Sequence, residues 1–216
     1  MKKIHIKNGF TMIELVMVVV VLGIIAALAI PRMQRDLKQE AADTILSDIR
    51  YAQHMAINDY RENPEKDKWQ RSFWQVKIER CADDTGLFIM VGADKDYQGD
   101  INKVEAATDP SNGKPMFWAN SDCSDGGDGT VSENIFLTKK FGVKDIDVSG
   151  GCSGQHIGFD HLGRPHVSFS GSDNPDYSSY MANACDMTFA LKTDTNFTIR
   201  ILPETGYAYI VDQNAS

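Results

Sequence analysis

The feature that most constrains this chain is an apolar run near its N-terminus, Phe10–Ile30. The run reads FTMIELVMVVVVLGIIAALAI, and Glu14 is its one charged residue. As a helix it would be about 31 Å long, at about 1.5 Å per residue, which matches the hydrocarbon core of a bilayer. The nine residues before it carry three lysines and no acid. Because positive charge stays on the cytoplasmic side, we expect everything after Pro31 to lie outside the membrane.

Two ordinary interpretations of this run stay open at this point. A secretory signal peptide has a shorter apolar stretch and a small-residue cleavage site, which the alanines at 26, 27 and 29 imitate. A plain single-pass anchor is the other. Neither explains Glu14, because a carboxylate inside an apolar helix costs about 2.5–3.5 kcal/mol on insertion scales. A free amine on Phe10, four residues earlier, would offset that cost if the chain were cut after Gly9. The pair could form within one chain or between neighbouring chains.

The stretch GFTMIELV at residues 9–16 resembles the cleavage and N-methylation signal of type IV prepilins and type II secretion pseudopilins. Gly23 and the run AALAIP at 26–31 sit where this family has them. The resemblance implies cleavage after Gly9 by the prepilin peptidase and methylation of Phe10. It also implies that Glu14 pairs with the N-terminus of a neighbouring subunit during filament assembly. The implied partners are other pilins or pseudopilins and an inner-membrane assembly platform.

Four segments follow from these observations. They are a leader peptide at 1–9, a transmembrane or filament-core helix at 10–30, an amphipathic continuation of that helix at 31–62, and a globular β-rich periplasmic head at 63–216. Pro31 lacks an N–H, so we expect the helix to kink or loosen there, and Gly23 is a second weak point. Beyond Pro31, apolar residues recur every three or four positions and predict one buried face that ends before Asn63-Pro64.

The remainder of the chain predicts strands and turns. Alternating or continuous apolar runs indicate strands at 73–78, 87–91, 156–160, 165–169, 187–191, 197–202 and 207–211. Residues 106–130 are rich in Asp, Ser, Asn and Gly and predict a long surface loop. The expected fold class is α+β and pilin-like, with a long N-terminal hydrophobic helix packed on a mainly antiparallel β-sheet head.

Three further segments resemble the FimT/GspH group of minor pilins and pseudopilins. They are ILSDIRYAQ at 45–53, GFDHLGR at 158–164, and FTIR at 197–200 with the following TGY at 205–207. This resemblance implies a minor pilin or pseudopilin, held in the inner membrane with a periplasmic head and then assembled into a periplasmic or cell-surface filament.

The segment at 94–105 has the spacing of a 12-residue calcium loop. It offers side-chain oxygens at positions 1, 3, 5, 7 and 9, a glycine at position 6 and a glutamate at position 12. The candidate ligands are Asp94, Asp96, Gln98, Asp100, Asn102 and Glu105. The other interpretation is a solvated acidic turn between strands, because a strand precedes the loop where an EF-hand has a helix. A second acidic cluster at 122–128 lacks this spacing and predicts a flexible loop.

The four cysteines, Cys81, Cys123, Cys152 and Cys185, would lie in an oxidising compartment where disulfides persist. Three pairings are available to four cysteines. One hypothesis joins sequence neighbours, Cys81 to Cys123 and Cys152 to Cys185, and the other two pairings stay open. Each bond would contribute about 2–4 kcal/mol.

The charge balance bears on the remaining function classes. With 22 basic and 30 acidic residues, the formal net charge is −8, and loss of the three leader lysines takes it to about −11. This acidity opposes nucleic-acid binding through overall charge. A DNA-binding or adhesive tip pilin is the alternative function, with Arg164 and Arg200 as the candidate phosphate contacts. The sequence has no nucleophile motif, phosphate loop or paired-carboxylate pattern, so we expect no catalysis.

Overall fold

The computed structural model describes residues 11–119, 121–152, 154, 156–169, 171 and 173–211, with the backbone alone for 27–36. The chain divides into two compact units, Met1–Leu37 and Lys38–Ser216. Helix α1, Met12–Asn58, has 47 residues and contributes to both units. The leader at 1–9 and Phe10 lie outside the described residues.

In the first unit, the described side chains belong to a helix with no packing partner. The large apolar residues from Met12 to Ile25 are between 47% and 86% exposed. The backbone stays helical through Gly23 and Pro31. The helix is therefore not interrupted at these two positions, where we expected it to kink or loosen. Pro31 lacks one N–H donor, which removes one backbone hydrogen bond and does not by itself end a helix. Loosening of this stretch in a filament stays a prediction.

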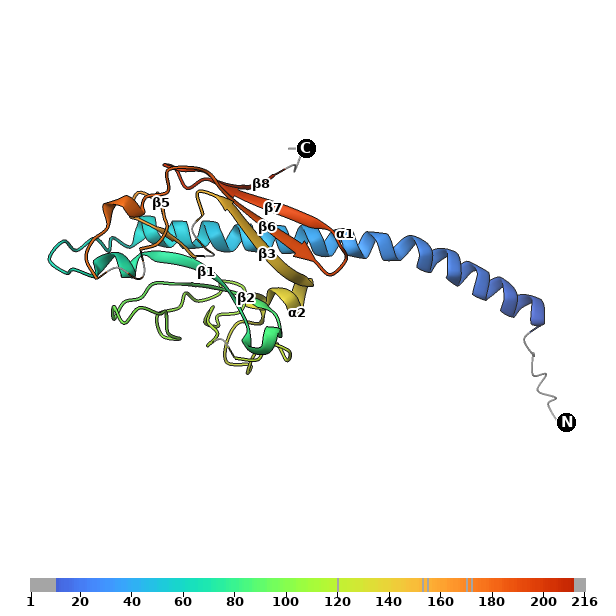
Figure 1. Ribbon diagram of the computed structural model, residues 1–216. Helices are drawn as coiled ribbons and strands as arrows, with labels where there is room; N and C mark the ends of the chain where they lie inside the picture. The colour runs from blue at the N-terminus through green and yellow to red at the C-terminus, as the bar shows by residue number, and fades with distance from the viewer. Residues whose placement is uncertain are drawn as a thin grey trace. The chain divides into compact units, whose positions relative to one another are not determined.

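The second unit contains two four-stranded antiparallel sheets (Figure 1). The first has the order β2-β1-β4-β5. Its strands are β1 (Trp74–Arg80), β2 (Leu87–Gly92), β4 (His156–Phe159) and β5 (Pro165–His166). The second has the order β3-β6-β7-β8. Its strands are β3 (Val143–Gly150), β6 (Cys185–Leu191), β7 (Asn196–Ile201) and β8 (Ala208–Ile210). The predicted α+β class is confirmed, with two sheets where the sequence suggested one.

The short helices connect these strands. They are η1 (Trp69–Ser72), η2 (Ala82–Asp84), η3 (Glu133–Ile135), α2 (Leu137–Phe141) and η4 (Tyr177–Ser179). The described part of residues 106–130 forms isolated β-bridges and turns but no strand, as expected for a loop. The loop is not wholly at the surface, because Ala107, Met116 and Cys123 are buried in the core.

One hydrophobic core fills the second unit. The predicted apolar face of α1 is confirmed within this unit, where Ala41, Ile45, Ile49, Ala52 and Ala56 are buried. Ala42 and Leu46, beside this face, are buried as well. They share the core with inward-facing residues of both sheets, including Phe88 of β2 and Phe189 of β6. Full burial of each large side chain contributes about 1.5–3 kcal/mol. The helix ends at Asn58, before Asn63-Pro64, as predicted.

Two disulfides tie the head together. Cys81 after β1 is joined to Cys123 in the loop, with the two Cα atoms 5.8 Å apart. Cys152 after β3 is joined to Cys185 at the start of β6, with Cα atoms 4.9 Å apart. This is the pairing of sequence neighbours. The first bond fixes the long loop to the first sheet, and the second closes one end of the β3–β6 pair.

Candidate functional site

Glu14 lies in the first turn of helix α1, and Thr11 directly precedes this helix. The Glu14 carboxylate accepts hydrogen bonds from the Thr11 backbone N–H at 3.1 Å and the Thr11 hydroxyl at 2.9 Å. The Glu14 N–H in turn donates to the Thr11 hydroxyl oxygen at 3.3 Å. This reciprocal arrangement is a capping box, and its Thr-x-x-Glu spacing is visible in the sequence. Our sequence analysis missed it, and so missed a partner for Glu14 within its own chain.

The helix surface around Glu14 is apolar on all sides. Leu15, Val18 and Leu22 are 47–60% exposed, as are residues on the other faces. A helix that is hydrophobic all round becomes stable when lipid or other helices cover it. Across the part of the chain that the structure describes, no helix combines the length and the apolar character needed to cross a membrane.

The three head segments that resemble the FimT/GspH group meet at one side chain. The Gln53 amide of α1 donates to the Gly163 carbonyl and to the Thr205 carbonyl, both at 2.8 Å. Gly206 has a φ of +63°, and a Cβ there would lie 2.3 Å from the Gly163 carbonyl oxygen. Two turns and the helix are therefore packed too closely for a larger residue at 206. The contacts give these segments a structural role in joining the turns to α1.

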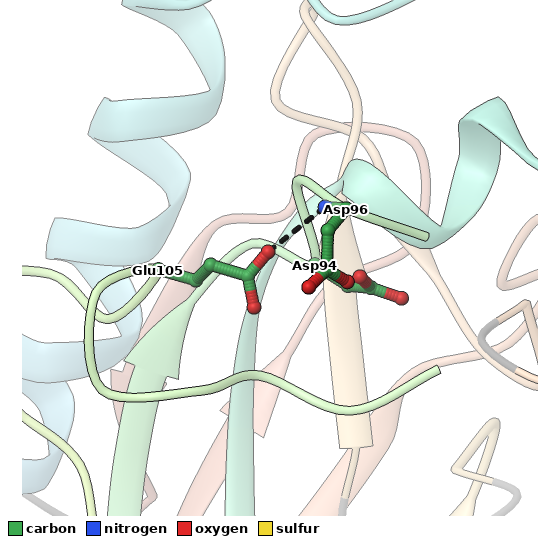
Figure 2. Close-up of side chains that lie close together, drawn as sticks. All are labelled: Asp94, Asp96 and Glu105. Carbon is green, nitrogen blue, oxygen red and sulfur yellow. Dashed lines mark hydrogen bonds between the residues drawn. The ribbon is translucent and has the colours of Figure 1, made fainter. Parts of the chain in front are cut away.

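Three members of the predicted calcium loop come together (Figure 2). One carboxylate oxygen from each of Asp94, Asp96 and Glu105 lies within 4.8 Å of the other two. Asp94 and Glu105 are 2% and 3% exposed, whereas Asp96 is exposed. Burial raises the pKa of Asp94, and the neighbouring Asp96 and Glu105 carboxylates add to the rise, against a hydrogen bond from the Gly99 N–H.

Backbone groups of the same loop already bind these carboxylates. Glu105 accepts from the N–H groups of Lys95 at 2.6 Å and Asp96 at 2.9 Å, and a third bond comes from the Asn102 N–H. Asp94 accepts from the Gly99 N–H at 2.7 Å. These bonds hold the loop in shape without an ion. Both an acidic turn and a cation-binding loop can have such bonds, so they do not decide between the two interpretations.

The other three predicted ligands do not join the cluster in the same way. The Asp100 carboxylate accepts from the Lys77 ammonium at 3.0 Å and is directed to β1. Asn102 donates its side-chain N–H to Asp96 at 3.4 Å, so its oxygen is turned to the Val104 N–H. Gln98 takes part through its backbone N–H. Calcium takes six to eight oxygens, so three carboxylates would need carbonyl and water ligands, and calcium binding stays a prediction.

Both arginines considered for phosphate contact have carboxylate partners. Arg164 donates through Nε and Nη2 to the Asp160 carboxylate, both at 2.7 Å. Arg200 forms a bidentate pair with Asp186 at 2.6 and 2.7 Å. Each positive charge is therefore locally neutralised, and this arrangement adds no support to the DNA-binding alternative.

A buried Asp–His–Ser network also escaped the sequence analysis. His166 Nδ1 lies 2.9 Å from the Ser179 hydroxyl, and His166 Nε2 lies 3.4 Å from the Asp160 carboxylate. These are the residue types of a hydrolase triad, but the three residues are only 3–7% exposed. A substrate cannot reach a hydroxyl buried in this way. The network instead joins β5 to η4 and to the turn at 160–164.

Comparison with known proteins places a recognised motif on the N-terminal unit. The family model described as the prokaryotic N-terminal methylation motif matches residues 5–30. This range includes Gly9, Phe10, Glu14 and Gly23. No curated protein and no solved structure matches the chain. The match supports a type IV pilin-like protein that is processed as a prepilin.

Proposed function

We propose that this chain is a minor pilin or pseudopilin, a structural subunit of a type IV pilus or a type II secretion pseudopilus. The observation that carries the proposal is the methylation motif at 5–30, whose described residues form a helix with exposed apolar side chains. The prepilin peptidase cuts after Gly9 and Phe10 is methylated. The subunit then assembles through its N-terminal helix with other pilins or pseudopilins on the inner-membrane platform. Its role is structural and not catalytic.

The proposed location is the inner membrane, with a single pass and a periplasmic head, before transfer into a filament. Two observations support it. Three lysines precede the apolar run, and positive charge is retained on the cytoplasmic side. The two disulfides of the head suit an oxidising compartment such as the periplasm. Within the pilin-like class, the FimT/GspH group is the subgroup that we propose.

Glu14 sets the register of assembly in this proposal. The apolar helix supplies most of the cohesion between subunits, but an apolar surface alone does not favour one axial position over another. A carboxylate that needs a positive partner does favour one axial position, the one that brings it next to that partner. The free Phe10 amine of a neighbouring subunit is such a partner, and a charge-assisted bond in a water-poor filament core is stronger than one in water.

The Thr11–Glu14 capping box provides a matched pair of variants that tests this role. Glu14→Val removes the carboxylate and hence both the cap and the proposed intersubunit pair. Thr11→Val removes the hydroxyl that caps the helix but leaves the carboxylate. We expect Glu14→Val to be made and membrane-inserted but depleted at least about tenfold from purified filaments, the loss that a strong charge-assisted bond of about 1.5–3 kcal/mol allows. We expect Thr11→Val to be incorporated nearly as well as the unchanged protein.

Equal depletion of both variants would show that Glu14 acts only as a helix cap. Incorporation of Glu14→Val at the normal level would overturn the assembly role altogether. Gly9→Val serves as the processing control. It is expected to leave a band that is not shifted by the peptidase on a gel, whereas Glu14→Val is expected to be cut normally.

A further inference from the structure

A cavity of about 510 Å³ opens to solvent where the head portion of α1 lies next to residues 109–111, η3 and α2. Its walls come from α1, from residues 109–111, from η3 and from α2. The charged residues that line it are Asp43 and Asp48 of α1, Asp109, and Lys140 of α2. Three carboxylates therefore face one ammonium group across a shared space.

Asp109 is a fixed negative charge in this cavity. The residue is 5% exposed, and its carboxylate accepts from the Ser111 N–H at 2.8 Å, the Ser111 hydroxyl at 2.7 Å and the Asn134 amide at 2.8 Å. Asn112 and Ser132 also donate to it. Burial alone would raise the pKa of Asp109, but the bonds from Ser132, Ser111 and Asn134 outweigh it and lower the pKa. Asp109 thus remains ionised.

Asp48 lies in the same cavity without such support. Its side chain is partly buried and forms no hydrogen bond or ion pair with any residue in the described parts of the chain. Burial of the carboxyl group raises the pKa of Asp48 to about 8, the Asp109 charge adds to the rise, and the Lys140 ammonium opposes it. Lys140 is itself engaged, since its ammonium donates to the Asn134 side-chain carbonyl.

The remaining titratable groups around the cavity have other partners. Asp43 is exposed and accepts from Gln39 at 2.9 Å. Tyr51, one turn after Asp48, donates its hydroxyl to the Thr108 carbonyl at 3.0 Å. Burial and the Asp109 charge raise the pKa of Tyr51 above its usual value, so it stays neutral when Asp48 ionises. Asp48 is the group whose charge changes.

We propose that Asp48 is a proton-dependent latch between α1 and the segment at 108–112, whose Thr108 carbonyl accepts the hydroxyl of Tyr51 on the same helix. The neutral carboxyl group lines the same pocket as the Asp109 charge without repulsion, and the segment at 108–112 stays docked on α1. When Asp48 releases its proton to solvent, two carboxylates face each other in a cavity whose one ammonium group is already bonded. The segment at 108–112 then loosens from the helix, while α2, whose Leu137 and Phe141 are buried in the core, stays in place.

The sign of the pH dependence follows from the direction of the shift. The folded-state pKa of Asp48 lies above the value of about 3.9 in an unfolded chain, so between these values the folded head holds one more proton. Its contribution to stability is complete below about pH 4 and is lost as the pH rises through the folded-state value. Within that window the unfolding equilibrium constant rises by up to about tenfold per pH unit from this group.

Amide hydrogen exchange on the full chain in detergent micelles tests the latch between pH 6 and pH 9, with rates corrected for intrinsic exchange. For the unchanged protein we expect peptides covering 108–112 to lose protection by up to about tenfold per pH unit as the pH rises from 6 to the folded-state pKa of Asp48, and to level off above it. Peptides covering 137–141 should keep their protection, because Leu137 and Phe141 are buried in the core. Asp48→Asn keeps a neutral isostere, and we expect its protection to be flat over this range. Asp43→Asn is the control and should behave like the unchanged protein.

Two more variants should move the transition in opposite directions. Asp109→Asn removes the charge that adds to the effect of burial on the pKa of Asp48, so protection should level off at a lower pH. Lys140→Gln removes the charge that opposes the rise in this pKa, so protection should level off at a higher pH. If protection in the unchanged protein stays constant from pH 6 to pH 9, or if Asp48→Asn loses protection in the same way, the latch is overturned. Because Lys140 is exposed, Lys140→Gln gives a readout even if Asp109→Asn does not fold.

Discussion

Glu14 has a partner for its carboxylate in its own chain and, in our proposal, a stronger one in the next subunit. The contact with Thr11 is made of neutral donors on an exposed helix terminus. Such a cap contributes about 1 kcal/mol and holds the carboxylate at the start of the helix. It does not neutralise the charge. A neighbouring amine would do so, which is why the Thr11 and Glu14 variants are expected to differ.

At the same scale, Asp160 allows a prediction about acid stability. Burial would raise the pKa of Asp160, but hydrogen bonds from His166 and from the backbone and side chain of Arg164 hold it well below its usual range. Its folded-state pKa is therefore depressed, and its stabilising contribution is present above about pH 4 and lost as the pH falls below that value. We expect Asp160→Asn to destabilise the head by about 1.5–3 kcal/mol at pH 7.

Thermal unfolding at pH 7 and at pH 3 measures this effect. The melting temperature of Asp160→Asn should lie clearly below that of the unchanged protein at pH 7, and the difference should shrink at pH 3. Asp173→Asn is the matched control, because the Asp173 carboxylate is itself exposed where it pairs with Lys68 and Arg71, and an exposed carboxylate should contribute less. A difference that is just as large at pH 3 would contradict the assignment of the stabilisation to the Asp160 charge.

Among the elements, those with regular apolar spacing could be predicted from the sequence, and those with irregular spacing could not. The strand at 87–91 and the end of α1 agree with the structure because their patterns are strong and local. Strand β3 was missed because its register shifts between Val143 and Asp145, which breaks the alternation of inward and outward residues. Helix α2 has five residues, too few for a periodic pattern.

The candidate sites show the same division between local and long-range information. The methylation motif and the loop at 94–105 are continuous in sequence, and the motif was recognised. The capping box was equally local and was overlooked. The cavity around Asp48 joins residues 43–48, 109–111, 134 and 140, so nothing short of the tertiary structure reveals that Asp48 faces Asp109.

The loop at 94–105 supports a prediction at the scale of one element. If the three carboxylates complete a calcium site with carbonyl and water ligands, isothermal titration with calcium alone should give saturable heat. Glu105→Gln should abolish that heat, because it removes a charge and one of the three clustered ligands. Asp122→Asn, in the acidic segment without loop spacing, should bind calcium like the unchanged protein. Absence of heat in the unchanged protein would leave the loop as an acidic turn held by its own backbone bonds.

For the whole molecule, the two units differ in how they satisfy their apolar surface. The head buries its large apolar side chains in one core and is fastened by two disulfides. The described side chains of the N-terminal unit bury few of their apolar atoms, since its large apolar residues are at least 39% exposed. A unit of this kind is stable when other molecules cover it, which is the physical reason for connecting the methylation motif with assembly.

The central claim is that the subunit found in filaments begins at Phe10, with a methylated amine that pairs with Glu14 of a neighbour. Mass spectrometry of the N-terminal peptide from purified filaments tests it most directly. The account predicts a peptide that starts at Phe10 and is heavier by one methyl group, with Met1 to Gly9 absent. Recovery of assembled subunits that still carry the residues Met1 to Gly9 would contradict it.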